Sequence, residues 1–130
     1  MSRSDDQRQE IFRVIKEAML ALTPPMVVAK DGPQGLEIIG NVPVPYGSKQ
    51  EIIPGMYFAS AVLRKDMVSF YLFPLYAHAD AFGEVAPVAW KCLKGKTCFN
   101  FKKPEQVSRR EIDALMSRAL ALWKQEGFVK

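Results

Sequence analysis

Cysteine and histidine are scarce in this sequence. Its 130 residues include two cysteines, Cys92 and Cys98, and one histidine, His78. Two thiols make no disulfide framework, and these three side chains cannot supply the four ligands of a tetrahedral zinc site. The sequence therefore predicts no metal ligands and no cofactor, and the simplest interpretation of both cysteines is that they are small buried apolar residues.

Catalytic motifs are missing as well. The sequence contains no G-x-S-x-G, no H-E-x-x-H and no phosphate-binding glycine loop. His78 and Asp80 are two residues apart, a spacing at which side chains do not face each other on a helix. We therefore assign no catalytic residues.

Long apolar runs are also lacking. None approaches the roughly 20 residues of a membrane-spanning helix, and the opening residues MSRSDDQRQE do not resemble a signal peptide. Apolar residues make up 48% and charged residues 25% of the sequence, close to the averages of globular proteins. We expect a single domain, residues 1–130, in the reducing cytoplasm and not in a membrane.

Helical periodicity is present at both ends of the chain. Over residues 4–22, apolar side chains recur at the spacing of an amphipathic helix, which Thr23-Pro24-Pro25 then ends. A second helix is predicted to begin at Ser108, whose S-x-x-E pattern with Glu111 is that of a capping box. The apolar stripe of this helix consists of Ile112, Leu115, Met116, Ala119, Leu120 and Trp123.

Strand patterns lie between these helices. Met26–Lys30 and Leu36–Gly40 are joined by a glycine-bearing loop, and Met56–Arg64 and Met67–Phe73 by a two-residue turn, so both pairs are predicted hairpins. The second pair is apolar at several positions on both faces, as expected of central strands covered by helices. Residues 41–55 carry three prolines and two glycines, which predicts a loop with a short piece of edge strand.

The remaining segments complete a fold class. Short helical pieces are predicted after Pro74, and Thr97–Phe101 alternates polar and apolar residues as a strand does. Two hairpins and one further strand form an antiparallel sheet, and the two terminal helices can bury their apolar stripes against it. We predict a two-layer α+β domain with the N- and C-terminal helices packed on one face of the sheet.

Positive charge is concentrated in one segment. Between Lys91 and Arg110 there are seven basic residues and one acid, which gives this segment a charge of +6 in a chain of net charge +4. Such asymmetry points to an anionic partner. The basic residues are Lys91, Lys94, Lys96, Lys102, Lys103, Arg109 and Arg110.

The strand Thr97–Phe101 has two unlike faces. Phe99 and Phe101 point into the predicted core, which makes their rings unavailable for stacking on bases and argues against nucleic-acid binding. Cys98 and Asn100 point the other way. An amide on a strand must face water or find polar partners, so Asn100 is either an ordinary solvent-facing residue or part of a site.

A ligand site, if the chain has one, is predicted on the face of Cys98 and Asn100. Lysines at the ends of the strand would suit a small anion, and the central hairpin offers aromatic side chains beside it. The candidate ligand-binding residues are Tyr57, Tyr71, Lys91, Lys96, Cys98 and Asn100.

Two stretches of the chain resemble a known family. MYFASAVLRKDMVSFYLFPLYAHADAF and KCLKGKTCFNFKK are similar to the YdhG-like family of bacterial domains of unknown function, and the run Gly95–Phe101 is the most specific part. The resemblance implies a compact α+β domain with an antiparallel sheet and a helix at each end. Some members are described as frataxin-like intracellular iron chaperones, so the resemblance also implies iron binding as an alternative function.

These observations lead to an ordered set of expectations. The first is a small, non-catalytic binding or chaperone-type domain of the cytoplasm that takes a small anionic ligand or a protein partner. The alternative is a frataxin-like iron-binding chaperone, and the third is an uncharacterised enzyme. The sequence sets neither the identity of the partner nor the number of subunits.

Overall fold

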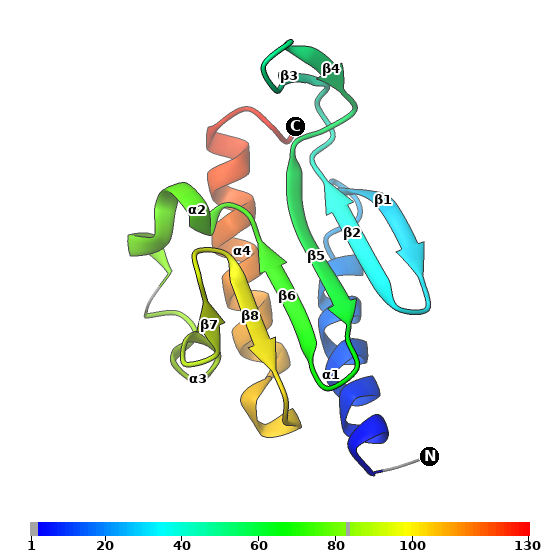
Figure 1. The fold of residues 1–130 in the computed structure, drawn as a ribbon. Coiled ribbons are helices and arrows are strands. Elements are labelled where there is room, and N and C mark those ends of the chain that lie inside the picture. The colour runs from blue at the N-terminus through cyan, green and yellow to red at the C-terminus, as the bar shows by residue number, and fades with distance from the viewer. Residues whose placement is uncertain (1–2, 83) are drawn as a thin grey trace.

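A six-stranded antiparallel sheet forms one layer of the structure (Figure 1). The computed structural model describes residues 3–82 and 84–130. The strands, in their order across the sheet, are β1 (Val27–Gly32), β2 (Gly35–Ile39), β5 (Tyr57–Leu63), β6 (Val68–Leu72), β8 (Cys98–Phe101) and β7 (Leu93–Lys94). A small second sheet pairs β3 (Val44–Tyr46) with β4 (Glu51–Ile53).

Two long helices form the other layer. They are α1 (Arg3–Leu20) and α4 (Arg109–Gln125), and they lie side by side on one face of the sheet, behind it in Figure 1. The short helices are α2 (Leu75–His78), η1 (Ala79–Ala81), α3 (Pro87–Trp90) and η2 (Pro104–Gln106). The predicted two-layer α+β fold, with both terminal helices on one face, is confirmed. No helix in the described part of the chain is long and apolar enough to cross a membrane.

The sheet face toward the helices is the core. Leu36, Ala61, Phe70 and Phe99 lie opposite one another on four neighbouring strands, and none is more than 2% exposed. Phe101 is also fully buried. The prediction that Phe99 and Phe101 are core residues is therefore confirmed, and their rings do not reach solvent.

Helix α4 closes this core with an aromatic contact. The Trp123 ring centroid lies 6.3 Å from that of Phe58 and 6.2 Å from that of Phe73, both edge to face. Aromatic pairs in this geometry stabilise a fold beyond their buried area. The apolar stripe of α4 predicted from the sequence thus packs on the sheet, as expected.

The β5–β6 hairpin is confirmed, but its second face is not covered by helices. Ala61 pairs with Phe70 and Leu63 with Val68 around the predicted turn. The face of β2, β5 and β6 turned toward the viewer in Figure 1 carries no helix in the described part of the chain. We call it the open face, and it is the face on which Asn100 lies.

Three local predictions need correction. The sheet has a sixth strand, β7, where two hairpins and one further strand were predicted, because Leu93 and Lys94 pair with β8. Residues 41–55 form the β3–β4 hairpin, which projects beyond the end of the sheet in Figure 1, where a loop with one short strand was expected. Ser108 does cap α4, since its Oγ accepts the Glu111 amide at 3.1 Å. The Glu111 carboxylate, however, accepts the amides of Val88 at 3.2 Å and Ala89 at 2.8 Å, so it caps α3 instead of closing the box.

Candidate functional site

A row of polar side chains crosses the open face at right angles to the strands. Residues paired in an antiparallel ladder lie on the same face, about 4.8 Å apart from strand to strand. Read from β1 to β7, the paired residues are Lys30, Glu37, Ser60, Tyr71, Cys98 and Lys94. The strand register therefore places one polar side chain from each of the six strands in a single row.

A hydrogen-bonded group lies beside this row. Arg64, which follows β5, donates from Nε to Ser69 Oγ at 2.8 Å and from Nη2 to the Tyr71 hydroxyl at 2.6 Å. The Ser69 hydroxyl in turn donates to Asn100 Oδ1 at 2.8 Å, and the Cys98 thiol donates to the same oxygen at 3.4 Å. We call these five residues the Arg64 network.

The bonds of the Arg64 network have a consistent direction. The Asn100 oxygen accepts twice, Ser69 both accepts and donates, and Tyr71 accepts from the guanidinium. Within the described residues, no acceptor takes the side-chain amide hydrogens of Asn100, the Tyr71 hydroxyl hydrogen or the Arg64 Nη1 hydrogens. The network thus uses its acceptors internally and leaves donors for a ligand.

The Arg64 guanidinium also has no acidic counter-ion. Its partners are two hydroxyl groups, and no carboxylate of residues 3–82 or 84–130 lies within ion-pair distance of it. By contrast, Arg13 on α1 bridges Glu10 at 2.6 Å and Glu17 at 2.9 Å. The uncompensated positive charge on the open face favours an anion.

Tyr57 adds a further polar group on β5, beside the Arg64 network. Its hydroxyl lies 2.5 Å from Ser60 Oγ. Burial disfavours the phenolate and raises the pKa of Tyr57 to about 12, with the Ser60 hydrogen bond opposing the shift and the charges of Glu37, Tyr71 and Cys98 adding to it. Tyr57 is therefore a neutral hydroxyl throughout the physiological range.

The raised pKa of Tyr57 predicts that the folded chain loses stability at alkaline pH. Its pKa in the folded chain lies above the ordinary value of 10.0, so the unfolded chain ionises first as the pH rises. The stability contributed by neutral Tyr57 is complete below pH 10 and is lost between pH 10 and about 12. We expect the urea midpoint to fall more steeply over this range in the natural chain than in Tyr57→Phe. Equal slopes in the two proteins would contradict the assignment.

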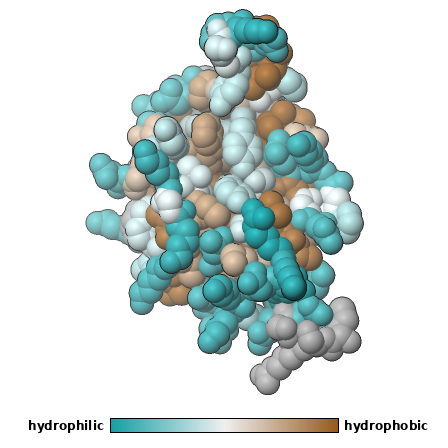
Figure 2. Space-filling model, viewed as in Figure 1, coloured by the Kyte–Doolittle hydropathy of each residue, from teal (hydrophilic) through white to brown (hydrophobic). Residues whose placement is uncertain are grey.

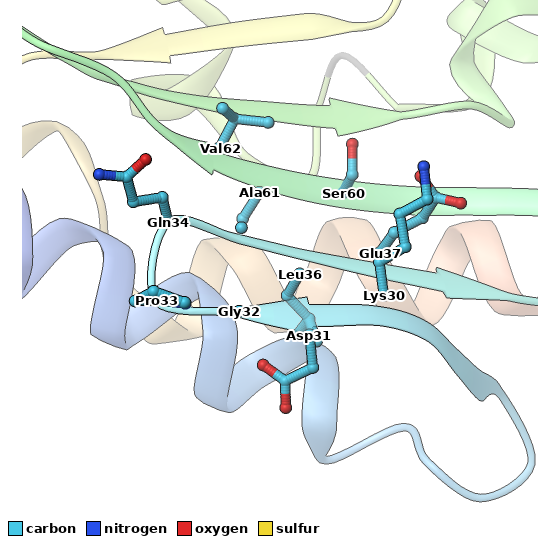
Figure 3. A pocket seen from close by; sticks show the side chains of 11 residues that line it. Lys30, Asp31, Gly32, Pro33, Gln34, Leu36, Glu37, Ser60, Ala61 and Val62 are labelled. Atoms are coloured by element: carbon cyan, nitrogen blue, oxygen red, sulfur yellow. The ribbon is translucent and has the colours of Figure 1, made fainter.

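Two hollows lie toward opposite ends of strand β2. The larger has a volume of about 530 Å³ and lies between the β1–β2 hairpin and β5. In Figure 3, Ser60 and Glu37 point to one side of the sheet and Asp31 to the other, where Asp31 pairs with Lys16 of α1 at 2.9 Å. Lining residues of this hollow are Lys30, Asp31, Gly32, Pro33, Gln34, Gly35, Leu36, Glu37, Ser60, Ala61 and Val62.

The smaller hollow lies where the β3–β4 hairpin meets the sheet. Its volume is about 290 Å³. Glu37 borders both hollows, and Tyr57 connects the smaller one to Ser60. The lining residues are Ala29, Glu37, Ile39, Tyr46, Ile53, Pro54, Gly55, Met56 and Tyr57.

The open face is polar in its middle and apolar toward its edges. Figure 2 shows this face with pale and teal residues at the centre, and with brown patches beside and below the projecting hairpin. The exposed apolar residues include Tyr46, at 51%, and Ile52, at 68%, both on the hairpin. Of these two, Tyr46 lines the smaller hollow beside Glu37 and Tyr57, so apolar surface that can bury part of a ligand adjoins the polar groups of the open face.

Four of the six predicted site residues share the open face. Tyr71, Cys98 and Asn100 belong to the Arg64 network, and Tyr57 contacts Ser60 beside it. The structure does not bring the two predicted lysines into this group. Lys96 lies in the β7–β8 turn with its Nζ 4.9 Å from the ring centroid of Tyr76, and Lys91 follows α3.

The basic residue that holds Ser69 and Tyr71 on the open face is Arg64, which the sequence reasoning missed. A signal for it was available, because Ser60, Val62 and Arg64 stand two residues apart and therefore share a face of one strand. Lys94 lies opposite Cys98, at the β7 edge of the same face. The cysteines differ from the simplest interpretation, since Cys92 is buried but Cys98 is half-buried on the open face.

Metal-ligating side chains do not cluster in the described part of the chain. Residues 3–82 and 84–130 contain no group of three or more His, Cys, Asp or Glu side chains that could hold a metal ion. The single histidine, His78, has its Nε2 3.6 Å from a carboxylate oxygen of Glu126.

Comparisons with known proteins add no relative. No family model matches the chain, and neither a curated protein nor a solved structure shows significant similarity to it.

Proposed function

We propose that this chain is a small, non-catalytic binding domain that holds an anionic ligand on the open face of its sheet. The observation that carries the proposal is the direction of the Arg64 network. Its acceptors are used within the protein, while the Arg64 Nη1 hydrogens, the Tyr71 hydroxyl hydrogen and the Asn100 side-chain amide hydrogens have no acceptor among the described residues. A carboxylate or phosphate offers acceptors only and complements such a surface.

The network also prepares Arg64 for binding. A free arginine side chain loses much rotamer freedom when it is ordered by a ligand. Here Ser69, which is 1% exposed, and Tyr71 already hold the guanidinium in place. A planar guanidinium presents paired donors in a fixed geometry that matches an oxyanion, so less ordering remains to be done when the anion arrives.

Arg64→Met is expected to weaken anion binding. The test is a titration of the ¹⁵N-labelled protein with sodium phosphate and with sodium acetate at low ionic strength, where surface charges are least screened. We expect both anions to shift the amide signals of Ser69, Tyr71 and Asn100 in the natural chain. In Arg64→Met the affinity should fall at least about tenfold, the loss of one charge-assisted hydrogen bond.

Arg110→Met is the matched control for this experiment. Arg110 is an exposed arginine of α4, on the layer opposite the open face, and its removal lowers the net charge by the same amount. We expect Arg110→Met to bind both anions as the natural chain does. Equal binding by Arg64→Met and the natural chain, or equal losses in both variants, would contradict a site at Arg64.

We do not propose the frataxin-like iron-binding alternative, which stays an expectation of the resemblance. A frataxin-like iron surface would need carboxylate oxygens of the first helix that are available to the ion. Two acids of α1, Glu10 and Glu17, are engaged by Arg13, and Arg8 pairs with Asp5. The formal charge of +4 also opposes the capture of a free cation.

A further inference from the structure

The smaller hollow is mainly apolar and small. Ile39, Ile53 and Met56 line it, together with the rings of Tyr46 and Tyr57. Its volume of about 290 Å³ is at the lower limit of the roughly 300–1,000 Å³ of small-molecule pockets. It can therefore bury an alkyl chain or one ring, while the rest of the ligand lies outside.

A continuous path on the open face connects this hollow to the Arg64 network. Tyr57 forms part of its wall, and the Tyr57 hydroxyl contacts Ser60. Ser60 lies directly opposite Tyr71, whose hydroxyl is bound by Arg64. Tyr57 and Ser60 are three residues apart on β5, which corresponds to about 10 Å of strand. A ligand that connects the hollow to the guanidinium therefore has to span this length and one further strand-to-strand step of about 4.8 Å, from Ser60 to Tyr71.

Glu37 sets the direction of such a ligand. Its side chain borders the smaller hollow, and its carboxylate forms no ion pair within the described residues. Lys30 lies opposite it on β1, at the far side from the network. An acid group placed at the rim of the hollow would meet the Glu37 charge, whereas one placed at Arg64 meets a positive charge without a counter-ion. Charge complementarity therefore places the acid at Arg64 and the apolar part under the β3–β4 hairpin.

We infer that the ligand is an amphipathic acid, with its apolar chain or ring in the hollow under the β3–β4 hairpin and its acid group on Arg64. This inference rests on the proposed anion-binding function and adds the second half of the ligand. The hairpin supplies Tyr46 and Ile53 to the apolar end, and the sheet supplies the donors of the Arg64 network to the acid end.

The test compares octanoate with acetate on the full chain. Both probes carry the same carboxylate, and octanoate adds six methylene groups. Each buried methylene is worth about fourfold in affinity, so burial of two or more should make octanoate bind at least about tenfold tighter than acetate. We expect Arg64→Met to weaken the binding of both probes, and octanol, which lacks the charge, to bind more weakly than octanoate.

Two adjacent residues of β4 provide a matched pair of variants. Ile53 lines the hollow, whereas Ile52 is 68% exposed and does not. We expect Ile53→Ser to lower octanoate affinity about tenfold and to leave acetate and phosphate binding unchanged. Ile52→Ser should change none of the three. Circular dichroism of each variant checks that the loss does not come from unfolding.

The outcomes separate this inference from the proposed function. If octanoate binds no tighter than acetate, or if Ile52→Ser and Ile53→Ser lose octanoate equally, the amphipathic ligand is wrong while anion binding at Arg64 stands. If octanol binds as tightly as octanoate and is unaffected by Arg64→Met, the proposed orientation is wrong. If neither phosphate nor acetate binding depends on Arg64, the proposed function is wrong, and so is this inference, which rests on it.

Discussion

Gly55→Ala is expected to lower the free energy of unfolding by about 3 kcal/mol, the upper range for inserting a group into a packed interior. A β-carbon at this position would lie 1.9 Å from the backbone oxygen of Gly40 and 2.8 Å from its carbonyl carbon. Neither atom can move away easily, because the Gly40 amide donates to Met56 O at 2.9 Å. On its other side, a β-carbon on Gly40 would lie 2.3 Å from the Phe128 oxygen.

Urea denaturation of Gly55→Ala measures this cost, and Gly32→Ala is its control. Gly32 lies at the end of β1, and a β-carbon there meets no atom within 4 Å. We expect Gly32→Ala to change the unfolding free energy by less than about 0.5 kcal/mol, as surface substitutions usually do. If both variants had the same midpoint, the close approach of the backbones at Gly40 and Gly55 would be wrong.

Phe99→Ala should cost about 3–5 kcal/mol, the range for removing a large aromatic side chain from a core. Phe99 is fully buried, and its ring centroid lies 5.9 Å from those of Phe70 and Phe101 and 6.1 Å from that of Trp90. These rings belong to three different segments of the chain. Truncation would leave a cavity among them that no neighbouring side chain can fill without leaving its own contacts.

Thermal and urea unfolding of Phe99→Ala should both show the loss, with Tyr46→Ala as the aromatic control. Tyr46 is 51% exposed on the β3–β4 hairpin, and its truncation should cost less than about 1 kcal/mol. A midpoint for Phe99→Ala close to that of Tyr46→Ala would contradict the placement of Phe99 in the core. Since Tyr46 also borders the smaller hollow, a stable Tyr46→Ala protein would be a further reagent for ligand binding.

The layers of this protein could be predicted because their signals are local and periodic. The apolar stripe of α4 repeats every three or four residues, so it specifies a helix and the side that it buries. The alternation in Thr97–Phe101 likewise assigned Phe99 and Phe101 to the core and Cys98 and Asn100 to the other face. These inferences need only the neighbours of each residue in the chain, and the structure confirms them.

The β3–β4 hairpin was missed because it lacks such a local, periodic signal. Its strands are three residues each, too short for an alternation to stand out, and the three prolines between residues 41 and 55 suggested a loop. Its position depends on contacts far along the chain, since Asn41 exchanges two hydrogen bonds with the backbone of Lys130. A sequence pattern carries no signal for contacts across so many residues.

The sequence by itself determined which side chains face the core and which face away, because backbone geometry translates periodicity into faces. Which polar residues meet was decided by the tertiary structure alone. The strand register sets Ser60 opposite Tyr71 and Tyr71 opposite Cys98, and the β5–β6 turn folds Arg64 back over them. The predicted Lys91 and Lys96 are near Asn100 in sequence, but hydrogen bonding across strands depends on register, and register placed Arg64 there instead.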